Sequence, residues 1–239
     1  MRNAGQVLMS RLRKLLRRTS AGRPVAIRMR GALPAEGVVA NAPRDPLIAQ
    51  LRYDPDLARR IDAALQLAKT GNLPEPSVVL AGIGLPGVAC TAHHRTILHA
   101  LAAASPVVVA ELSFAEAFAS SRAALVEALG AARDPGAASC LALHSADTDP
   151  QIRLAALRAA CEVGDPAAAR WTMQLLADPA ETVIVKAVHT CVVLGTKAAL
   201  PQLEPLAAHP SWWVRTRATQ AIAALGAASA AGEAVVRAA

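Results

Sequence analysis

The densest group of potential metal ligands in the sequence is one cysteine with three histidines inside ten residues. They are Cys90, His93, His94 and His99. Thiolate and imidazole are ligands that zinc prefers, and a zinc site draws them from two clusters or from a histidine pair four residues apart on a helix. The sequence contains neither a second cluster nor such a pair. We therefore expect no metal site and interpret these four residues as structural.

A second pattern with chemical meaning is the glycine run Gly82-x-Gly84-x-x-Gly87, which follows the apolar stretch Val78–Ala81. After a strand, such spacing lets the backbone approach the pyrophosphate of a dinucleotide. A proline stands where the phosphate-binding helix should begin, and no further β-α units follow. The sequence favours a glycine-proline connection between helices, with Val107–Ala110 buried and no bound cofactor. A nucleotide-dependent enzyme is the alternative.

No arrangement of a nucleophile, a base and an acid can be argued from the sequence. His144, His189 and His209 are isolated from one another, and most acidic residues lie at predicted helix starts. Such acids accept hydrogen bonds from free backbone N–H groups and need no catalytic role. We therefore expect a protein that is not an enzyme.

The elements that would position these residues are set by a repeat. Gly164, Gly195 and Gly226 recur every 31 residues, and the positions twelve and eight residues upstream hold Ile152, Val183 and Val214 and then Ala156, Ala187 and Ala218. A fixed period of this length is typical of a solenoid. We predict helices throughout residues 113–226, ending at these three glycines and at Gly130.

Each repeat also has a recognisable start. The pairs Asp149-Pro150, Asp178-Pro179 and His209-Pro210 precede the apolar pattern. An aspartate can cap the first turn of a helix, and a proline in that turn loses no needed donor. Glycine then favours the left-handed backbone that ends a helix.

These strings resemble a known family. Residues 149–157, 195–203 and 209–218 are similar to HEAT repeats, particularly to the bacterial kind grouped with phycobilin-lyase-like HEAT proteins. The resemblance covers residues 113–239 and implies an all-α fold, an α-solenoid of HEAT-like helical hairpins. It does not fix the function, because scaffolds, transport receptors, lyases and a few DNA-repair enzymes share the fold.

The candidate partner-binding residues are two tryptophans and three arginines: Trp212, Trp213, Arg215, Arg217 and Arg153. Neighbouring residues on a helix point about 100° apart. We therefore expect one tryptophan to pack on the preceding repeat and the other to serve as a surface anchor. The alternatives are structural roles for both tryptophans and a ladder in which Arg153 and Arg215 pair with aspartates at repeat starts, as the resemblance implies. The central repeat departs from the pattern, with Ile184 at the arginine position and Lys186 nearby.

The last repeat has little sequence left to cover it. A solenoid needs a terminal unit with a polar outer face, but only residues 227–239, rich in alanine, follow Gly226. We expect them to leave apolar surface exposed near Trp212, Trp213 and Leu225. This predicts self-association or partner binding through the C-terminal end.

The N-terminal segment carries the basic charge of the chain. Residues 1–30 hold nine Lys or Arg and no acid, so the formal net charge of +7 becomes −2 without them. A leucine stripe in residues 7–18 lies opposite Arg13, Lys14, Arg17 and Arg18, a pattern suited to an anionic membrane surface, a nucleic acid or an acidic partner. A disordered basic tail without a dedicated target is the alternative.

Three regions follow from these patterns: a basic, partly disordered segment with a linker (1–44), a helical region of undefined fold (45–112) and the repeat domain (113–239). Four widely spaced cysteines indicate a reducing compartment, and no apolar run is long enough to span a bilayer. We expect a cytoplasmic, non-catalytic scaffold that binds a protein partner, with the N-terminus as a candidate attachment to a membrane surface. Nucleic-acid binding through the N-terminus and a phycobilin-lyase-like enzyme are the alternatives.

Overall fold

The computed structural model describes residues 45–238, together with their side chains except those of residues 135–138 and 228–238. The described residues form helices and no strand, which confirms the all-α prediction. They divide into two compact units, one ending at Ala132 and one beginning at Arg133. The boundary expected at residue 113 lies at the end of a helix inside the first unit. The four residues predicted to attach the chain to a surface, Arg13, Lys14, Arg17 and Arg18, lie outside the described residues.

The first unit packs around one central helix. It consists of α2 (Pro46–Tyr53), α3 (Leu57–Thr70), α4 (Pro76–Gly82), α5 (Ala92–Ala104), α6 (Pro106–Ser113), η1 (Glu116–Ser121), α7 (Arg122–Ala128) and η2 (Leu129–Ala132). Helix α5 contacts α3, α6, α7 and η2. Its buried face carries Ile97, Leu98 and Leu101, which recur at the three- and four-residue spacing of one helix face.

The glycine run of the first unit has a packing role. The stretch expected to resemble a strand, Val78–Ala81, is part of helix α4, so no β-α-β unit forms. A Cβ at Gly82 would overlap the side chain and the carbonyl oxygen of Leu51 on α2. Gly84 has φ +78°, a backbone conformation that side chains disfavour. The two glycines thus let α4 approach α2 and then turn the chain, and Val108, Val109 and Ala110 are buried in helix α6, as predicted.

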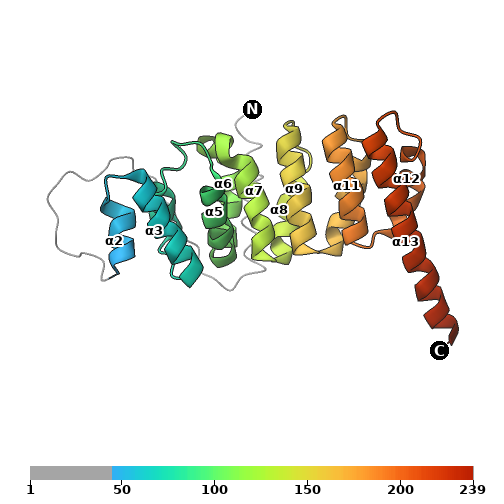
Figure 1. Ribbon diagram of the computed structural model, residues 1–239, viewed down its shortest axis with the longest axis horizontal. Coiled ribbons are helices and arrows are strands. Elements are labelled where there is room, and N and C mark those ends of the chain that lie inside the picture. Colours follow the sequence, from blue (N-terminus) through green and yellow to red (C-terminus); the bar gives the residue numbers. More distant parts are fainter. Residues whose placement is uncertain (1–44, 239) are drawn as a thin grey trace, which may run out of the picture. The chain divides into compact units, whose positions relative to one another are not determined.

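The second unit is a solenoid of helical hairpins. It consists of α8 (Pro135–His144), α9 (Pro150–Val163), η3 (Pro166–Ala168), α10 (Ala169–Gln174), η4 (Leu175–Ala177), α11 (Glu181–Val193), η5 (Lys197–Ala199), α12 (Leu200–Leu206) and α13 (Trp212–Ala238). Helix α11 packs between α9 and α13, so that these three lie side by side (Figure 1). Helices α8, α10 with η4, and α12 each pack against this row as a second layer.

Alanine in the row of α9, α11 and α13 lets the helices approach one another. Ala156, Ala187 and Ala218 occupy equivalent positions in the three repeats and have no exposed surface. Interior packing is dense enough that a larger side chain at this level would push neighbouring helices apart. The period read from the sequence is therefore the period of the core.

Two of the four glycines predicted to end helices do so. Gly164 caps α9 with φ +67°, and Gly195 follows α11 with φ +62°. Gly130 instead lies buried inside η2, and the left-handed residue that follows it is Arg133, with φ 48°. Gly226 lies within α13, which continues to Ala238. The alanine-rich sequence on both sides of Gly226 favours helix strongly enough to offset the cost of one glycine, about 1 kcal/mol.

Candidate functional site

Arg153 is buried in an ion pair between two successive repeats. Only 8% of the residue is exposed. Its Nε donates to Asp178 Oδ2 at 2.7 Å and its Nη2 to Asp178 Oδ1 at 2.8 Å, while Nη1 donates to the carbonyl oxygens of Asp147 and Thr148. These bonds occupy the guanidinium within the fold, so Arg153 has a structural role here rather than the partner-binding role for which it was a candidate.

The pair alters the proton affinity of both groups. Burial alone would raise the pKa of Asp178, but the hydrogen bonds from Arg153 and from the Ala180 N–H, with the arginine's charge, hold this pKa below its usual range. The hydrogen bond to Asp178 also raises the pKa of Arg153. Both residues therefore stay charged throughout the physiological range.

Arg215 repeats part of this arrangement in the last hairpin. Its Nη1 donates to the carbonyl oxygens of His209 and Pro210, at 2.8 and 2.7 Å. His209 stands 31 residues after Asp178, and its Nδ1 accepts the Ser211 N–H just as the Asp178 carboxylate accepts the Ala180 N–H. Arg215 is half-buried and spends part of its hydrogen-bonding capacity on the fold.

Trp212 and Trp213 stack on each other at the start of α13. Their ring centroids lie 4.6 Å apart with an interplanar angle of 25°. Both remain exposed, at 55% and 53% of the residue surface. The expectation that one of them packs on the preceding repeat is therefore wrong, because the two rings cover each other instead.

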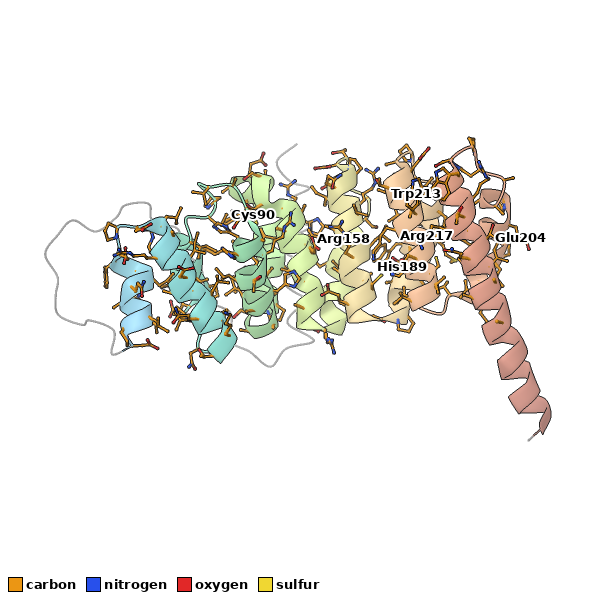
Figure 2. All side chains as sticks on the ribbon, in the orientation of Figure 1. Cys90, Arg158, His189, Glu204, Trp213 and Arg217 are labelled. Atoms are coloured by element: carbon orange, nitrogen blue, oxygen red, sulfur yellow. The ribbon has the colours of Figure 1, made fainter. Side chains whose placement is uncertain are left out.

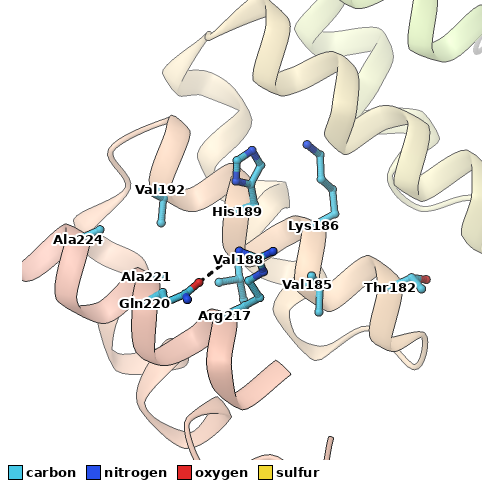
Figure 3. A pocket seen from close by; sticks show the side chains of 10 residues that line it. All are labelled: Thr182, Val185, Lys186, Val188, His189, Val192, Arg217, Gln220, Ala221 and Ala224. Atoms are coloured by element: carbon cyan, nitrogen blue, oxygen red, sulfur yellow. Dashed lines mark hydrogen bonds between the residues drawn. The ribbon is translucent and has the colours of Figure 1, made fainter. Parts of the chain in front are cut away.

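A groove of about 460 Å³ runs between α11 and α13 (Figure 3). Its apolar lining comes from Val185, Val188 and Val192 on α11 and from Ala221 and Ala224 on α13. Its polar lining is Thr182, Lys186, His189, Arg217 and Gln220. Figure 3 shows Lys186 and His189 projecting from the same side of α11, with Arg217 and Gln220 opposite on α13. Arg217 Nη1 donates to Gln220 Oε1 at 3.2 Å, which holds the guanidinium along the helix.

The polar groups of the groove give it a positive potential. Lys186 and Arg217 line it and no carboxylate does. Partial burial, followed by the charges of Lys186 and Arg217, lowers the pKa of His189. The imidazole is therefore neutral near pH 7, and an anion bound beside it would reverse part of this shift.

The groove continues toward the tryptophans along one face of α13. Trp213 lies four residues before Arg217, which places both on the same side of the helix with Gln220. Figure 2 shows Trp213 and Arg217 on neighbouring turns, opposite His189. Of the candidate partner-binding residues, Trp213 and Arg217 thus belong to one surface, while Trp212 adjoins it through the ring stack.

Lys186, His189 and Gln220 are site residues that the sequence interpretation did not assign to binding. The repeat carried a signal for them, because Lys186 and Arg217 are 31 residues apart, as are His189 and Gln220. Equivalent positions in stacked repeats line one surface. Arg158 precedes His189 in the same series, on the exposed face of α9.

The other chemical candidates have structural explanations. His94 is buried, its Nδ1 accepts the Thr91 N–H at 3.1 Å, and its Nε2 lies 3.0 Å from the carbonyl oxygen of Ile83. It therefore joins the glycine segment to α5. Within residues 45–238 no three potential metal ligands come together. Burial and nearby Cys161 raise the pKa of the Cys191 thiol to about 12, which keeps it protonated and unreactive.

The described helices were also compared with the length and apolarity that a membrane span requires. None of the helices within residues 45–238 meets both requirements.

Comparison with known proteins places the second unit in a family. Residues 141–223 match the family of HEAT repeats. No curated protein matches the sequence. One similar solved structure is the complex of CpcE and CpcF of phycocyanin lyase from Nostoc sp. PCC7120, with 20% identity over 86% of this chain and 74% of that one, and a TM-score of 0.48. Another is a designed armadillo repeat protein in complex with the peptide (KR)4, with 16% identity, 75% and 98% coverage and a TM-score of 0.49. The family match and the stacked hairpins identify residues 141–223 of this chain as HEAT repeats.

Proposed function

We propose that the chain is a non-catalytic scaffold that binds a protein partner at the groove between α11 and α13 and at the adjoining tryptophan pair. The observation that carries this proposal is the position of two exposed, stacked indole rings on the helix that supplies one wall of the groove. A large exposed aromatic surface is unfavourable in water unless a partner covers it.

The chemistry of the surface suits protein recognition. Tryptophan and arginine supply a large share of the binding free energy at protein interfaces, because each combines a broad apolar surface with directed polar groups. Trp213 and Arg217 present both kinds of group on one face of α13. The valines of α11 add apolar surface beside them.

The groove lacks the parts of a catalytic site. His189 is the one lining residue that could accept a proton near neutral pH, and neither a serine, a cysteine nor a carboxylate lines the groove with it. General-base catalysis needs a second group that the base can activate or that orients it. The lining residues of this groove are therefore better explained by binding.

A photo-crosslinking amino acid placed in the groove tests this function in cells. We would introduce it at Gln220, on the wall of the groove, and at Gln202 as the control. Gln202 is an exposed glutamine on α12, in the other layer of the same unit. A protein crosslinked at Gln220 and absent at Gln202 supports the proposal. Equal crosslinking at both positions, or none at either, contradicts it.

A further inference from the structure

We infer that the partner segment bound in the groove between α11 and α13 is acidic, with carboxylate side chains interspersed among apolar ones. This inference rests on the proposed function and names the class of partner that the same site would take.

The first argument is charge complementarity. Lys186, His189 and Arg217 approach the groove from both walls, and no acidic residue lines it. Neither Lys186 nor Arg217 forms an ion pair with a described acidic residue. Carboxylates are the groups on a protein partner that would meet these cations, and they would also favour the protonated form of His189.

The second argument is where this unit keeps its own acids. Residues 133–239 contain nine Lys or Arg and nine Asp or Glu, so the unit has no net formal charge. Several of the aspartates are held at helix starts: Asp147, Asp149, Asp165 and Asp178 each accept a backbone N–H two residues ahead. The positive potential of the groove therefore comes from the separation of charge within the repeat and not from an excess of basic residues.

The third argument separates a peptide from a nucleic acid. Grooves that bind single-stranded nucleic acid combine a basic track with aromatic side chains on which bases stack. The lining of this groove has valine and alanine in those places. Aliphatic side chains of a peptide fit this floor, with their neighbouring carboxylates reaching the walls.

The length of the groove sets the size of the segment. The lining residues of α11 run from Thr182 to Val192, a distance of about 15 Å along a helix that rises about 1.5 Å per residue. An extended peptide advances about 3.3 Å per residue and would cross this distance in about five residues. A short linear segment is therefore sufficient to fill the groove.

The test uses the full chain and a defined probe. The probe is a fluorescein-labelled peptide of about 12 residues in which glutamate and leucine alternate, long enough to span the groove in an extended form. Three further probes are the same peptide with glutamine for glutamate, the same peptide with lysine for glutamate, and a single-stranded DNA of equal length. Fluorescence anisotropy measures the affinity of each.

A pair of variants with equal charge separates the groove from the basic N-terminus. Lys186→Gln with Arg217→Gln removes two positive charges from the groove, and Arg17→Gln with Arg18→Gln removes two from the N-terminal segment. We expect the groove variant to bind the glutamate peptide about tenfold more weakly and the N-terminal variant to change less than about threefold. Lys186 and Arg217 are not buried, so circular dichroism should show both variants folded.

The pH dependence gives a second readout from the same groove. Binding of carboxylates should favour protonated His189, so the affinity for the glutamate peptide should rise between about pH 8 and about pH 6. The charged groups near His189 are Lys186 on its own helix and Arg217 on α13, and both keep their charge over this range. His189→Gln should remove most of the rise.

Four results would overturn the inference. They are no binding of the glutamate peptide at about 1 mM, equal binding of the glutamine peptide, a larger loss in the N-terminal variant than in the groove variant, and tighter groove-dependent binding of the DNA. If the crosslinker at Gln220 nevertheless captures a protein, the acidic class is wrong and the scaffold function stands. If that crosslink also fails, both proposals are wrong.

Discussion

The guanidinium of Arg153 and the carboxylate of Asp178 form a two-pronged ion pair that joins successive HEAT repeats. The nitrogen–oxygen distances are 2.7 and 2.8 Å, and the two residues lie 25 positions apart in the sequence. The same carboxylate accepts the Ala180 N–H just before α11. One period later the equivalent positions hold Ile184 and His209, so the charged pair is absent as a unit at the next junction.

The substitution pair Arg153→Ile with Asp178→His copies the next junction into this one. Each single substitution should lower the free energy of unfolding by about 3 kcal/mol or more, because it leaves the other charge buried without a partner. The double variant should lose less than the sum of the two, with a coupling of about 1–3 kcal/mol. Urea unfolding followed by circular dichroism gives all four values.

A matched pair with no buried charge serves as the control. Arg170 and Glu204 are exposed on α10 and α12, and their substitution by glutamine should change the free energy of unfolding by less than about 0.5 kcal/mol each. Strict additivity of Arg153→Ile and Asp178→His would mean that the ion pair does not act as one unit.

Acid should selectively weaken the wild-type junction. The folded-state pKa of Asp178 lies below the ordinary value of 3.8, so the unfolded chain binds the proton more readily. The stabilisation by this carboxylate is therefore present above about pH 4 and is lost as the pH falls through the folded-state value. Wild type and Asp178→Asn should differ most near pH 7 and converge below pH 4 in the midpoint of urea unfolding. A constant difference across this range would contradict the assignment.

Two glycines of the same repeat series should respond in opposite directions to substitution. Gly226→Ala replaces a glycine inside α13 where a Cβ meets nothing within 4 Å, and it should raise the free energy of unfolding by up to about 1 kcal/mol. Gly164→Ala places a Cβ on a residue with φ +67° and should lower it by about 1 kcal/mol. Thermal unfolding of the two variants measures both, and changes of the same sign would contradict the helix ends described above.

Those glycines also show how far the sequence predicted the fold. The period of 31 residues located the alanines of the core and the true helix ends at Gly164 and Gly195, because each of these features repeats with the packing that requires it. Gly226 shares the period but lacks the chain reversal that follows the others. Its helix continues, since a glycine ends a helix only where the following residues turn away.

The candidate site was harder to predict than the fold. Trp213 and Arg217 were assigned from residue type, whereas Lys186 and His189 become part of a site only because α11 lies beside α13. Arg153 and Arg215 look alike in sequence. They differ in structure because Asp178 is present to bury the first, and the second lies in the last repeat.

The exposed tryptophans give the sharpest test of the C-terminal end. Trp213 shares the face of α13 that carries Arg217 and Gln220, whereas Trp212 lies about 100° away and is equally exposed. Trp213→Ala should therefore weaken binding of the protein crosslinked at Gln220 by about 2 kcal/mol, a loss of about thirtyfold in affinity. Titration calorimetry with that protein measures the loss.

Trp212→Ala is the matched control, because it removes the same kind of ring from the other side of the stack. Its effect on binding should be smaller, about 1 kcal/mol or less, through the lost support of Trp213. Trp171 is 7% exposed in the preceding hairpin, so its blue-shifted fluorescence reports that both variants remain folded. Sedimentation velocity of the full chain distinguishes partner binding from self-association, which the same two substitutions should weaken in the same order. A monomeric chain whose Trp213→Ala variant retains full affinity for the crosslinked protein would show that this end is not a docking surface.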